Sequence, residues 1–348
     1  MSREKIGVLV ADDSDGLRNV MVHVMERDHE IEVKGIARNG EEAIQQTLKL
    51  KPDVITMDLM MPKIDGLEAT RQIMALRPTP IVVVTSLDDS QKSFEAIRAG
   101  ALEVLCKPQA IHTPDGMKCL SLIVRIAKMM ADVKVISHKP NKSLSTPQIR
   151  PITREHATAA KIVAIASSTG GPPVLHQILK RVGSNFSVPI LIVQHISPGF
   201  GQGLVEWLDA TIEAKVVKAQ EGELPLPGKI YIAPDNYHLL IDRNGKIRLS
   251  SGLPVKGHRP SANLMFESVA QYYGPTALGI ILTGMGDDGI QGLKMLKQEQ
   301  GFCIAQDEAS SIIFGMPKAA IENGLADLVM NPDEIAAYLQ NLANRSIN

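Results

Sequence analysis

One short segment places hydroxyl side chains directly after an apolar run that is typical of a buried β-strand. Residues 161–173 read KIVAIASSTGGPP, so Ser167, Ser168 and Thr169 precede two glycines and two prolines. Such a loop either cradles a phosphate or presents a serine as a nucleophile. It lacks the GxxxxGK[ST] and GxGxxG patterns of phosphate loops and the GxSxG elbow of α/β-hydrolases. Because proline suits the first turn of a helix, we expect a helix start here, whose backbone N–H groups could stabilise an oxyanion.

A serine nucleophile needs a base and a group that orients the base, and two later segments offer both. The run PILIVQH ends in His195, and ALGIILTG leads into GMGDDG, which holds Asp287 and Asp288. Parallel strands would bring these run ends to one edge of a sheet. Taken singly, such a histidine is more typical of a hydrogen-bonded strand end, and Asp-Asp-Gly of a turn, but together they favour a Ser-His-Asp triad. Two adjacent carboxylates also predict that one is protonated at mildly acidic pH.

A second group of polar residues follows apolar runs in the N-terminal third. Asp12 and Asp13 follow IGVLVA, Asp58 follows DVITM, Thr85 ends PIVVVT and Lys107 follows LEVLC. Ligands gather at the carboxyl ends of parallel strands, so we expect one shared crevice. Three carboxylates there repel one another unless a hard cation such as Mg²⁺ lies among them, while a lysine and a hydroxyl suit an incoming phosphoryl group. Any one of these residues alone is more typical of a turn or a cap.

Composition and charge narrow the class of protein. A chain of 348 residues with 44% apolar and 22% charged residues predicts two ordinary globular domains. The net charge of −1 gives no electrostatic reason to expect nucleic acid or an acidic membrane as a partner. No apolar run is long enough for a signal peptide or a membrane span, so we expect a cytoplasmic protein. The cysteines at 106, 119 and 303 are widely spaced, which favours small buried side chains over disulfides or a zinc site.

The chain divides near its middle. Residues 134–160 are rich in Lys and Arg, contain three prolines and lack a periodic pattern, so we predict a linker there. Within 1–133, and again within 161–348, apolar strand-like runs alternate with amphipathic stretches, which predicts parallel, doubly wound α/β sheets. The segment HLLIDRNGKIRLS carries Asn-Gly between alternating runs and predicts an antiparallel hairpin near residues 230–250.

Residues 1 to about 130 resemble a response-regulator receiver domain, in the acid pair at 12–13, in MDLMMPKIDG, in VVVTS and in CKP. The resemblance implies a flavodoxin-like (βα)5 fold and phosphorylation of Asp58 by a histidine kinase. It also implies that Mg²⁺ is bound by Asp12, Asp13, Asp58 and the backbone of Met60. Thr85 and Lys107 are implied to respond to the phosphoryl group. Many receivers carry an aromatic switch residue three positions before the lysine, but this chain has Val104.

Residues 161–348 resemble the catalytic domain of the CheB family of chemotaxis protein-glutamate methylesterases. The resemblance rests on SSTGG, QHISPGF, IYIAPDNYHLLI, GHRPSANLMF and LTGMGDDG. It implies that Ser168 is the nucleophile, His195 the general base and Asp288 the residue that orients the base. It further implies oxyanion donors in the backbone N–H groups of Thr169 and Met285. His258 and Arg259 either line the substrate groove or support the structure, and Ser167 stands where the family often has alanine.

The resemblance as a whole implies a phosphorylation-activated enzyme that hydrolyses glutamyl methyl esters on chemoreceptor helices and also deamidates receptor glutamines. Mg²⁺ is expected in the receiver and no cofactor for ester hydrolysis. The expected partners are methyl-accepting receptors and a histidine kinase, without nucleic acid or membrane insertion, and the expected state is a monomer.

Two other classes of function stay open at this stage. A DNA-binding output would need a helix-turn-helix unit and a basic face, and the sequence displays neither. A nucleotide-binding or scaffolding output would make the serine segment a binding loop rather than a catalytic one.

Overall fold

The computed structural model describes residues 5–87, 90–133, 160–183 and 186–345. The chain separates into two compact units, Met1–Leu144 and Ser145–Asn348, and each is treated by itself below. The linker predicted over 134–160 lies outside the described residues except for its last position.

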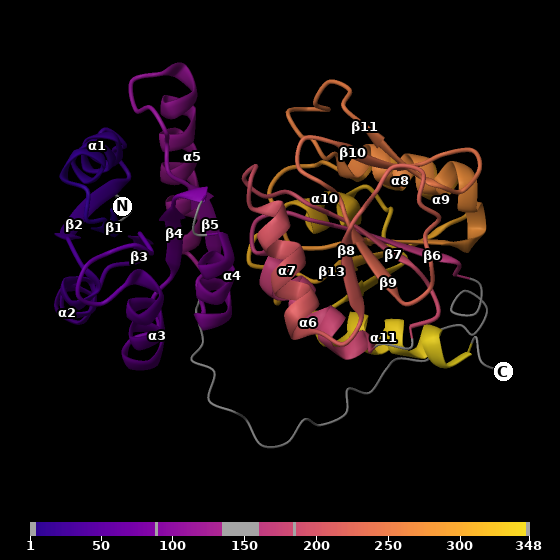
Figure 1. Cartoon of the computed structure of the whole chain (residues 1–348), viewed down its shortest axis with the longest axis horizontal. Coiled ribbons are helices and arrows are strands. Elements are labelled where there is room, and N and C mark those ends of the chain that lie inside the picture. The colour runs from indigo at the N-terminus through magenta and orange to yellow at the C-terminus, as the bar shows by residue number, and fades with distance from the viewer. Residues whose placement is uncertain (1–4, 88–89, 134–159, 184–185, 346–348) are drawn as a thin grey trace. The chain divides into compact units, whose positions relative to one another are not determined.

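The first unit is a five-stranded parallel sheet in the order β2-β1-β3-β4-β5. Strands and helices alternate along the chain, as the sequence predicts, and this order is that of the flavodoxin-like fold (Figure 1). The elements are β1 (Ile6–Ala11), α1 (Asp15–Glu26), β2 (Ile31–Ala37), α2 (Gly40–Leu50), β3 (Val54–Met57), α3 (Gly66–Leu76), β4 (Ile81–Thr85), α4 (Ser90–Ala99), β5 (Glu103–Cys106) and α5 (Pro114–Ala131).

Local signals explain where the helices of the first unit begin. The side chains of Ser14, Asn39, Asp65 and Thr113 each accept a hydrogen bond from the backbone N–H three residues later, which satisfies a donor that the helix leaves unpaired. Strands β1, β3 and β4 are buried nearly throughout, as expected for central strands that are covered by helices on both faces.

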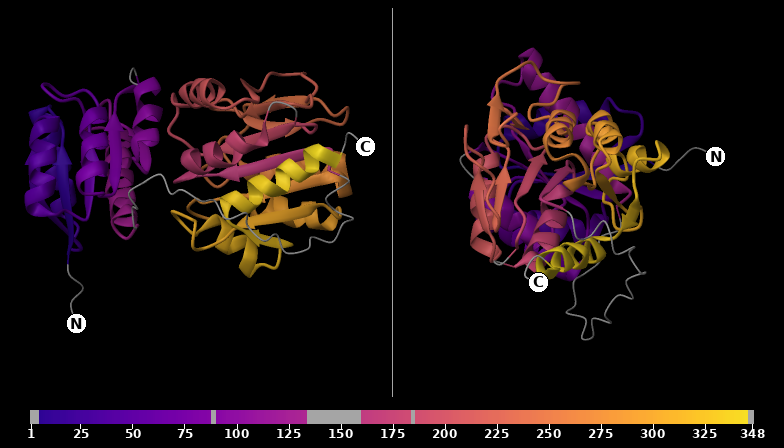
Figure 2. Two further views of the ribbon diagram at one scale, coloured as in Figure 1. Left: turned by 90° about the horizontal axis from the view of Figure 1, so that it is seen from below. Right: turned by 90° about the vertical axis from the view of Figure 1, so that its right-hand side faces the viewer.

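The second unit is built on a seven-stranded parallel sheet in the order β14-β13-β12-β6-β7-β9-β8. Figures 1 and 2 show its helices on both faces: α6 packs against α11 on one side, and α8 packs against α9 on the other. Its elements up to the hairpin are β6 (Ile162–Ser167), α6 (Gly171–Val182), β7 (Ile190–Gln194), α7 (Gly201–Thr211), β8 (Lys215–Lys218), β9 (Lys229–Ile232), β10 (His238–Ile241) and β11 (Ile247–Ser250). The remaining elements are α8 (Ala262–Tyr273), η3 (Gly274–Thr276), β12 (Ala277–Ile281), α9 (Ile290–Gln298), β13 (Phe302–Gln306), α10 (Met316–Glu322), β14 (Leu328–Met330) and α11 (Pro332–Arg345).

The predicted hairpin is confirmed as a separate two-stranded antiparallel sheet, β10-β11. Its turn is closed by Asp242, whose carboxylate accepts the N–H groups of Asn244 and Lys246, with Gly245 at a φ of 77°. The hairpin packs with α8 against the core of the second unit. Its buried side chains, Leu239, Ile241 and Ile247, therefore join the hydrophobic core that α8 forms with the parallel sheet.

The sequence patterns missed strand β8 at the sheet edge. It is four residues long, has lysine at both ends and buries only Val216 fully, so no sustained apolar run marks it. Short edge strands with charged ends are a common protection against pairing with other chains. No helix in the described ranges combines the length and the apolar character that crossing a bilayer requires.

Candidate active site and phosphorylation site

The serine segment, Ser167–Thr169, lies where the sequence places it, at the carboxyl end of the central strand β6. Ser168 directly follows the strand, and its backbone N–H donates to the carbonyl oxygen of Thr283 beyond β12 (3.0 Å). The next turn begins α6, with Pro172 and Pro173 in the first helical turn. A Cβ added to Gly171 would lie 2.1 Å from Gln194 Oε1, so this glycine is needed for packing within the site itself.

The two adjacent serines have different surroundings. The Ser167 hydroxyl is fully buried and donates to Gln194 Oε1 at 2.6 Å. Gln194 in turn donates through Nε2 to the carbonyl oxygens of Ser168 (2.8 Å) and His195 (2.7 Å). Gln194 therefore ties the ends of β6 and β7 together and engages the hydroxyl of Ser167, whereas Ser168, at the start of the turn, is 9% exposed.

His195 directly follows β7, and the register of the sheet places it beside the serine segment. Ser167 pairs with Gln194 in the parallel ladder, so Ser168 and His195 are the next residues on neighbouring strands. His195 Nε2 lies 2.9 Å from Asp288 Oδ2. A carboxylate only accepts hydrogen bonds, so Nε2 carries the proton. The other ring nitrogen, Nδ1, is buried and has no hydrogen-bond partner within the described parts of the chain.

Asp288 is 1% exposed and lies at the N-terminus of α8. Burial raises the pKa of its carboxyl group, but the hydrogen bond and the charge of His195, together with backbone N–H donors, outweigh burial and hold the pKa below its usual value. A helix N-terminus also favours a negative charge. Asp288 accepts four hydrogen bonds, from His195 Nε2 (2.9 Å), Ser261 Oγ (2.9 Å), Ala262 N (2.7 Å) and Asn263 N (3.1 Å).

The expectation that one of the two adjacent aspartates is protonated at mildly acidic pH is wrong for Asp288, whose pKa is lowered rather than raised. Asp287 lies apart from Asp288, with a side chain that is 60% exposed and paired with Lys256 at 2.6 Å. The helix N-terminus and His195 keep Asp288 ionised. The two carboxylates thus have different partners: Asp288 binds His195, and Asp287 binds Lys256.

The two residues whose backbone N–H groups are expected to face an oxyanion each adjoin a residue of this site, Thr169 adjoining Ser168 and Met285 adjoining Gly284. Thr169 follows the serine in the turn before α6, and its carbonyl oxygen accepts from Thr283 Oγ1 (3.0 Å). Met285 follows Gly284, and a Cβ added to Gly284 would lie 2.6 Å from Ser168 Cβ. Only a glycine allows the two backbones to approach this closely.

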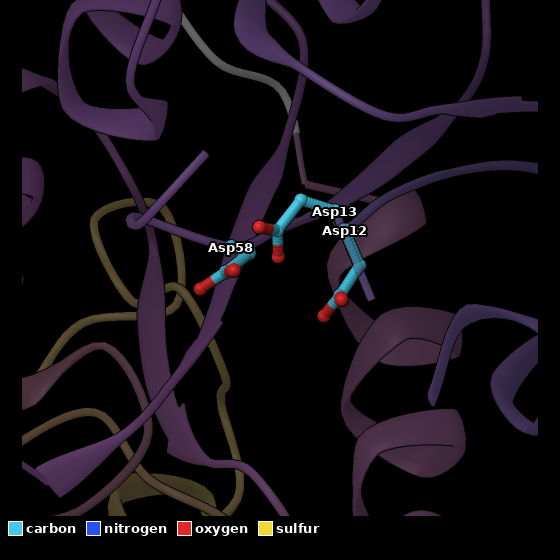
Figure 3. A group of neighbouring side chains, drawn as sticks. All are labelled: Asp12, Asp13 and Asp58. Carbon is cyan, nitrogen blue, oxygen red and sulfur yellow. The ribbon is translucent and has the colours of Figure 1, made fainter. Parts of the chain in front are cut away.

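The first unit gathers its polar residues at the carboxyl edge of its sheet. One carboxylate oxygen each from Asp12, Asp13 and Asp58 lies within 4.8 Å of the other two (Figure 3). Asp12 and Asp13 follow β1, and Asp58 follows the neighbouring strand β3. Three converging carboxylates are a donor set that suits a hard divalent cation. The predicted acidic cluster is therefore present.

Lys107 and Thr85 also reach this cluster. Lys107 Nζ lies 2.7 Å from Asp58 Oδ2 and 2.9 Å from Asp12 Oδ2, and Thr85 Oγ1 donates to Asp58 Oδ1 at 3.2 Å. Burial raises the pKa of Asp58, although Lys107 works against that change. Burial alone would lower the pKa of Lys107, but its bonds to the two aspartates raise it, so the lysine is charged.

Met60 and Val104 are two further positions singled out in the receiver. The Met60 backbone N–H donates weakly to Asp58 Oδ1 (3.4 Å), and the Met60 side chain is half exposed. Val104 is 2% exposed within β5. A buried valine has no ring to rotate, so an aromatic flip at this position is excluded as a transmission step.

Sequence reasoning missed two residues of the second site, Gln194 and Ser261. Gln194 lies in QHISPGF and Ser261 lies in GHRPSANLMF, two of the motifs that carry the family resemblance. Ser261 precedes an amphipathic stretch, which signals a helix cap, but its hydroxyl donates to Asp288 rather than to its own helix. Cys303 is buried as expected, whereas Cys106 and Cys119 are only half-buried.

These features together define a class of protein: a response regulator whose output domain carries serine, histidine and aspartate at one sheet edge. Comparison with known proteins agrees with that class. Residues 8–113 match the response regulator receiver domain and residues 163–339 match the CheB methylesterase family. The chain belongs to the CheB methylesterase family.

Relatives match along nearly the whole chain. A protein-glutamate methylesterase/protein-glutamine glutaminase of Myxococcus xanthus is 42% identical over 343 residues, covering 97% of both chains. One of Nitrosospira multiformis is 41% identical over 343 residues with the same coverage. Among solved structures, the CheB methylesterase catalytic domain of Thermotoga maritima is 40% identical, with a TM-score of 0.51, covering 53% of this chain and 98% of that one.

Proposed function

We propose that this chain is a phosphorylation-activated protein-glutamate methylesterase with a Ser-His-Asp triad, and that it also deamidates protein glutamine. The observation that carries the proposal is the bond from His195 Nε2 to the buried, ionised Asp288, beside Ser168 on the neighbouring strand. The printed names of the relatives along the whole chain support the substrate class.

In the first half of the reaction, Ser168 Oγ attacks the γ-carbonyl carbon of a glutamyl methyl ester. His195 Nδ1 takes the serine proton, because Nε2 already donates to Asp288. The imidazolium formed in this step is stabilised by the carboxylate. When the carbon–oxygen bond to the leaving group breaks, His195 returns the proton to methanol and an acyl-enzyme remains.

In the second half, water attacks the carbonyl carbon of the acyl-enzyme while His195 takes a proton from it. His195 returns this proton to Ser168 Oγ as the ester bond breaks, which frees the glutamic acid side chain and restores the serine hydroxyl. A glutamine substrate follows the same route, with ammonia leaving in place of methanol. The backbone N–H groups of Thr169 and Met285 are the proposed donors to the oxyanion in both halves. The place of Thr169 at the positive end of α6, and the close approach of Gly284, the residue before Met285, to Ser168, support this role.

In the receiver, Asp58 is the proposed phosphoacceptor, and its carboxylate would attack the phosphorus of a phosphohistidine or a small acyl phosphate. Asp12, Asp13, Asp58 and the Met60 carbonyl would hold Mg²⁺, which neutralises charge on the phosphoryl oxygens when bound. The chain's own contribution is the ammonium of Lys107 and the hydroxyl of Thr85, both already within reach of Asp58. After phosphorylation these two donors would bind phosphoryl oxygens.

The proposed partners follow from this chemistry. The substrate is the methylated cytoplasmic helix of a chemoreceptor, and the phosphodonor is a histidine kinase of the same sensory system. We place the protein in the cytoplasm as a monomer, with Mg²⁺ in the receiver and no cofactor in ester hydrolysis. The domain limits we propose are 1–133, 134–160 and 161–348.

The test is methanol release from methylated receptor membranes by the wild type and by two neighbouring serine variants. Ser168→Ala removes the nucleophile and should lower kcat by at least about 10⁴-fold. Ser167→Ala is the matched control, since it removes only a hydroxyl that is hydrogen-bonded to Gln194. It should keep activity within about tenfold of the wild type, a loss equal to one hydrogen bond. Equal loss in both variants, or full activity of Ser168→Ala, would rule out the assigned nucleophile.

A further inference from the structure

The loop between β11 and α8 holds His258 in a defined position. Val255 and His258 exchange two backbone hydrogen bonds (3.0 and 2.9 Å), so that Lys256 and Gly257 form a two-residue turn with φ values of 48° and 87°. Turns of this kind fix the residues that flank them. The Arg259 guanidinium donates to two carbonyl oxygens earlier in the same loop, at 2.9 and 3.0 Å. Arg259 thus supports the loop, which is one of the two roles left open for it.

The loop is also fastened to the rest of the second unit at both ends. His238 on β10 accepts the N–H of Ser261 through Nδ1 (3.2 Å), and its Nε2 lies 3.1 Å from the Leu253 carbonyl oxygen. Lys256 is bound to Asp287 at 2.6 Å. Hydrogen bonds to His238 and to Asp287 thus hold this loop in place, and with it the side chain of His258.

The ring of His258 lies flat against the ring of His195. Their centroids are 4.1 Å apart and their planes differ by 12°. The hydrogen bond of Nε2 to Asp288 fixes one edge of the His195 ring. His258 covers one face of the same ring. Stacked aromatic rings at this separation are in van der Waals contact.

We propose that His258 is a positioning residue for the reaction: its neutral ring keeps the His195 imidazole directed at Ser168 and stabilises the imidazolium that forms during acyl transfer. The inference rests on the function proposed above. A cation over the face of an aromatic ring is attracted to that face, and the attraction is larger where water is excluded. His195 carries its positive charge only along the reaction path, so the stacked ring favours the transition state over the resting enzyme.

The charged groups around the pair are consistent with a neutral His258. Asp288 is engaged by His195, Asp287 is paired with Lys256, and the Arg259 guanidinium is bound to backbone oxygens. Burial lowers the pKa of His258, and the charge of His195 lowers it further. The two aspartates oppose this change in pKa without cancelling it. His258 is therefore neutral at neutral pH and gains a proton only below its ordinary range.

This arrangement predicts a particular pH dependence. Once His258 is protonated at low pH, its positive charge lies 4.1 Å from the ring that must itself become positive during catalysis. Two imidazolium ions at that distance repel each other. The active form therefore needs a neutral His258 ring, and protonation of this ring at low pH should lower the kcat of the wild type.

The experiment compares His258→Ala and His258→Phe with the wild type in methanol release from methylated receptor membranes, over a range of pH. The alanine variant loses the stacked ring and should lower kcat about tenfold with KM within about twofold. The phenylalanine variant keeps an aromatic face without a titrating nitrogen, so kcat should recover to within about threefold of the wild type. Because this variant has no ring at position 258 that gains a proton, its kcat should fall less than that of the wild type as pH is lowered. Fluorescence of Trp207, the only tryptophan of the chain, checks that each variant is folded.

The outcomes separate this inference from the proposed function. If Ser168→Ala is inactive and His258→Ala matches the wild type, the stacking role is refuted and the triad stands. Phenylalanine as poor as alanine, or a loss confined to KM, would equally refute it, because either result assigns His258 to substrate binding. If Ser168→Ala keeps its activity, the proposed function fails, and the inference fails with it.

Discussion

At the scale of single residues, the second unit distinguishes groups that look alike in the sequence. Ser167 and Ser168 are adjacent hydroxyls, and Asp287 and Asp288 are adjacent carboxylates. In each pair the structure gives one member an ordinary partner, Gln194 for Ser167 and Lys256 for Asp287. The other member contributes to the site. Spacing alone could not separate the pairs, because the distinction depends on contacts between residues far apart in the chain.

Asp288 predicts a pH dependence of stability. Its folded pKa lies below the unfolded value because His195 and the N-terminus of α8 stabilise the charge. The folded state therefore binds fewer protons than the unfolded state over that interval, and stability falls as pH falls. The contribution is complete above the unfolded pKa of about 3.9 and is lost as pH falls through the folded pKa.

The measurement is urea unfolding of the full chain between pH 5 and pH 3, followed by the fluorescence of Trp207, which lies in α7 of the second unit. Asp288→Asn cannot lose a proton, so its unfolding midpoint should fall less over this range than that of the wild type. At pH 5 the variant should be less stable by about 1–3 kcal/mol, because a buried charge-assisted hydrogen-bond set is broken. Parallel curves for the two proteins would contradict the assigned role of the carboxylate.

At the scale of secondary structure elements, the ends of β6, β7 and β12 bring the chemistry together. The alternation of apolar runs and amphipathic stretches predicts these parallel strands, and with them the meeting of Ser168, His195 and Asp288 at one edge. Strand β8 escaped prediction because a four-residue edge strand has no pattern to read. Gln194 and Ser261 escaped because their partners are set by tertiary packing.

The approach of β12 to the serine segment depends on Gly284. A Cβ at this position would lie 2.5 Å from Met316 Sδ, 2.6 Å from Ser168 Cβ and 3.0 Å from Ser168 N. Backbone atoms must then shift, so Gly284→Ala should cost about 1–3 kcal/mol of stability and displace the serine. We expect kcat to fall at least about tenfold, because a displacement of a catalytic group by about 1 Å lowers the rate by at least that much.

Gly252→Ala is the matched control for Gly284→Ala in the same unit. There the nearest atom to an added Cβ is the Ser250 hydroxyl at 3.2 Å, which can rotate away. Both variants are measured by methanol release and by Trp207 unfolding. A Gly284→Ala protein as active and as stable as the Gly252→Ala protein would show that β12 has room to move.

At the scale of the whole molecule, two parallel sheets carry two different chemistries at their carboxyl edges. The acidic cluster with Lys107 in the first unit and the Ser168, His195 and Asp288 group in the second were both predictable from strand-end residues. The stacking of His258 on His195 could not be predicted from the sequence, because the two residues are far apart in the chain and meet only in the folded structure. Nor could the exposed position of Asp287, which depends on Lys256 in a distant loop.

Phosphorylation of Asp58 is expected to raise the rate of ester hydrolysis by Ser168, and methanol release measures that rate. The rate of methanol release from methylated receptor membranes is recorded before and after a small acyl phosphate and Mg²⁺ are added, for the wild type, Asp58→Asn and Ser168→Ala. Asp115→Asn, an exposed aspartate of the same unit whose side chain is 91% accessible, is the matched control.

We expect the rate to rise in the wild type and in Asp115→Asn, to stay at its starting value in Asp58→Asn and to be absent throughout in Ser168→Ala. An equal rise in Asp58→Asn, or no rise in the wild type after its phosphorylation has been verified, would contradict this expectation.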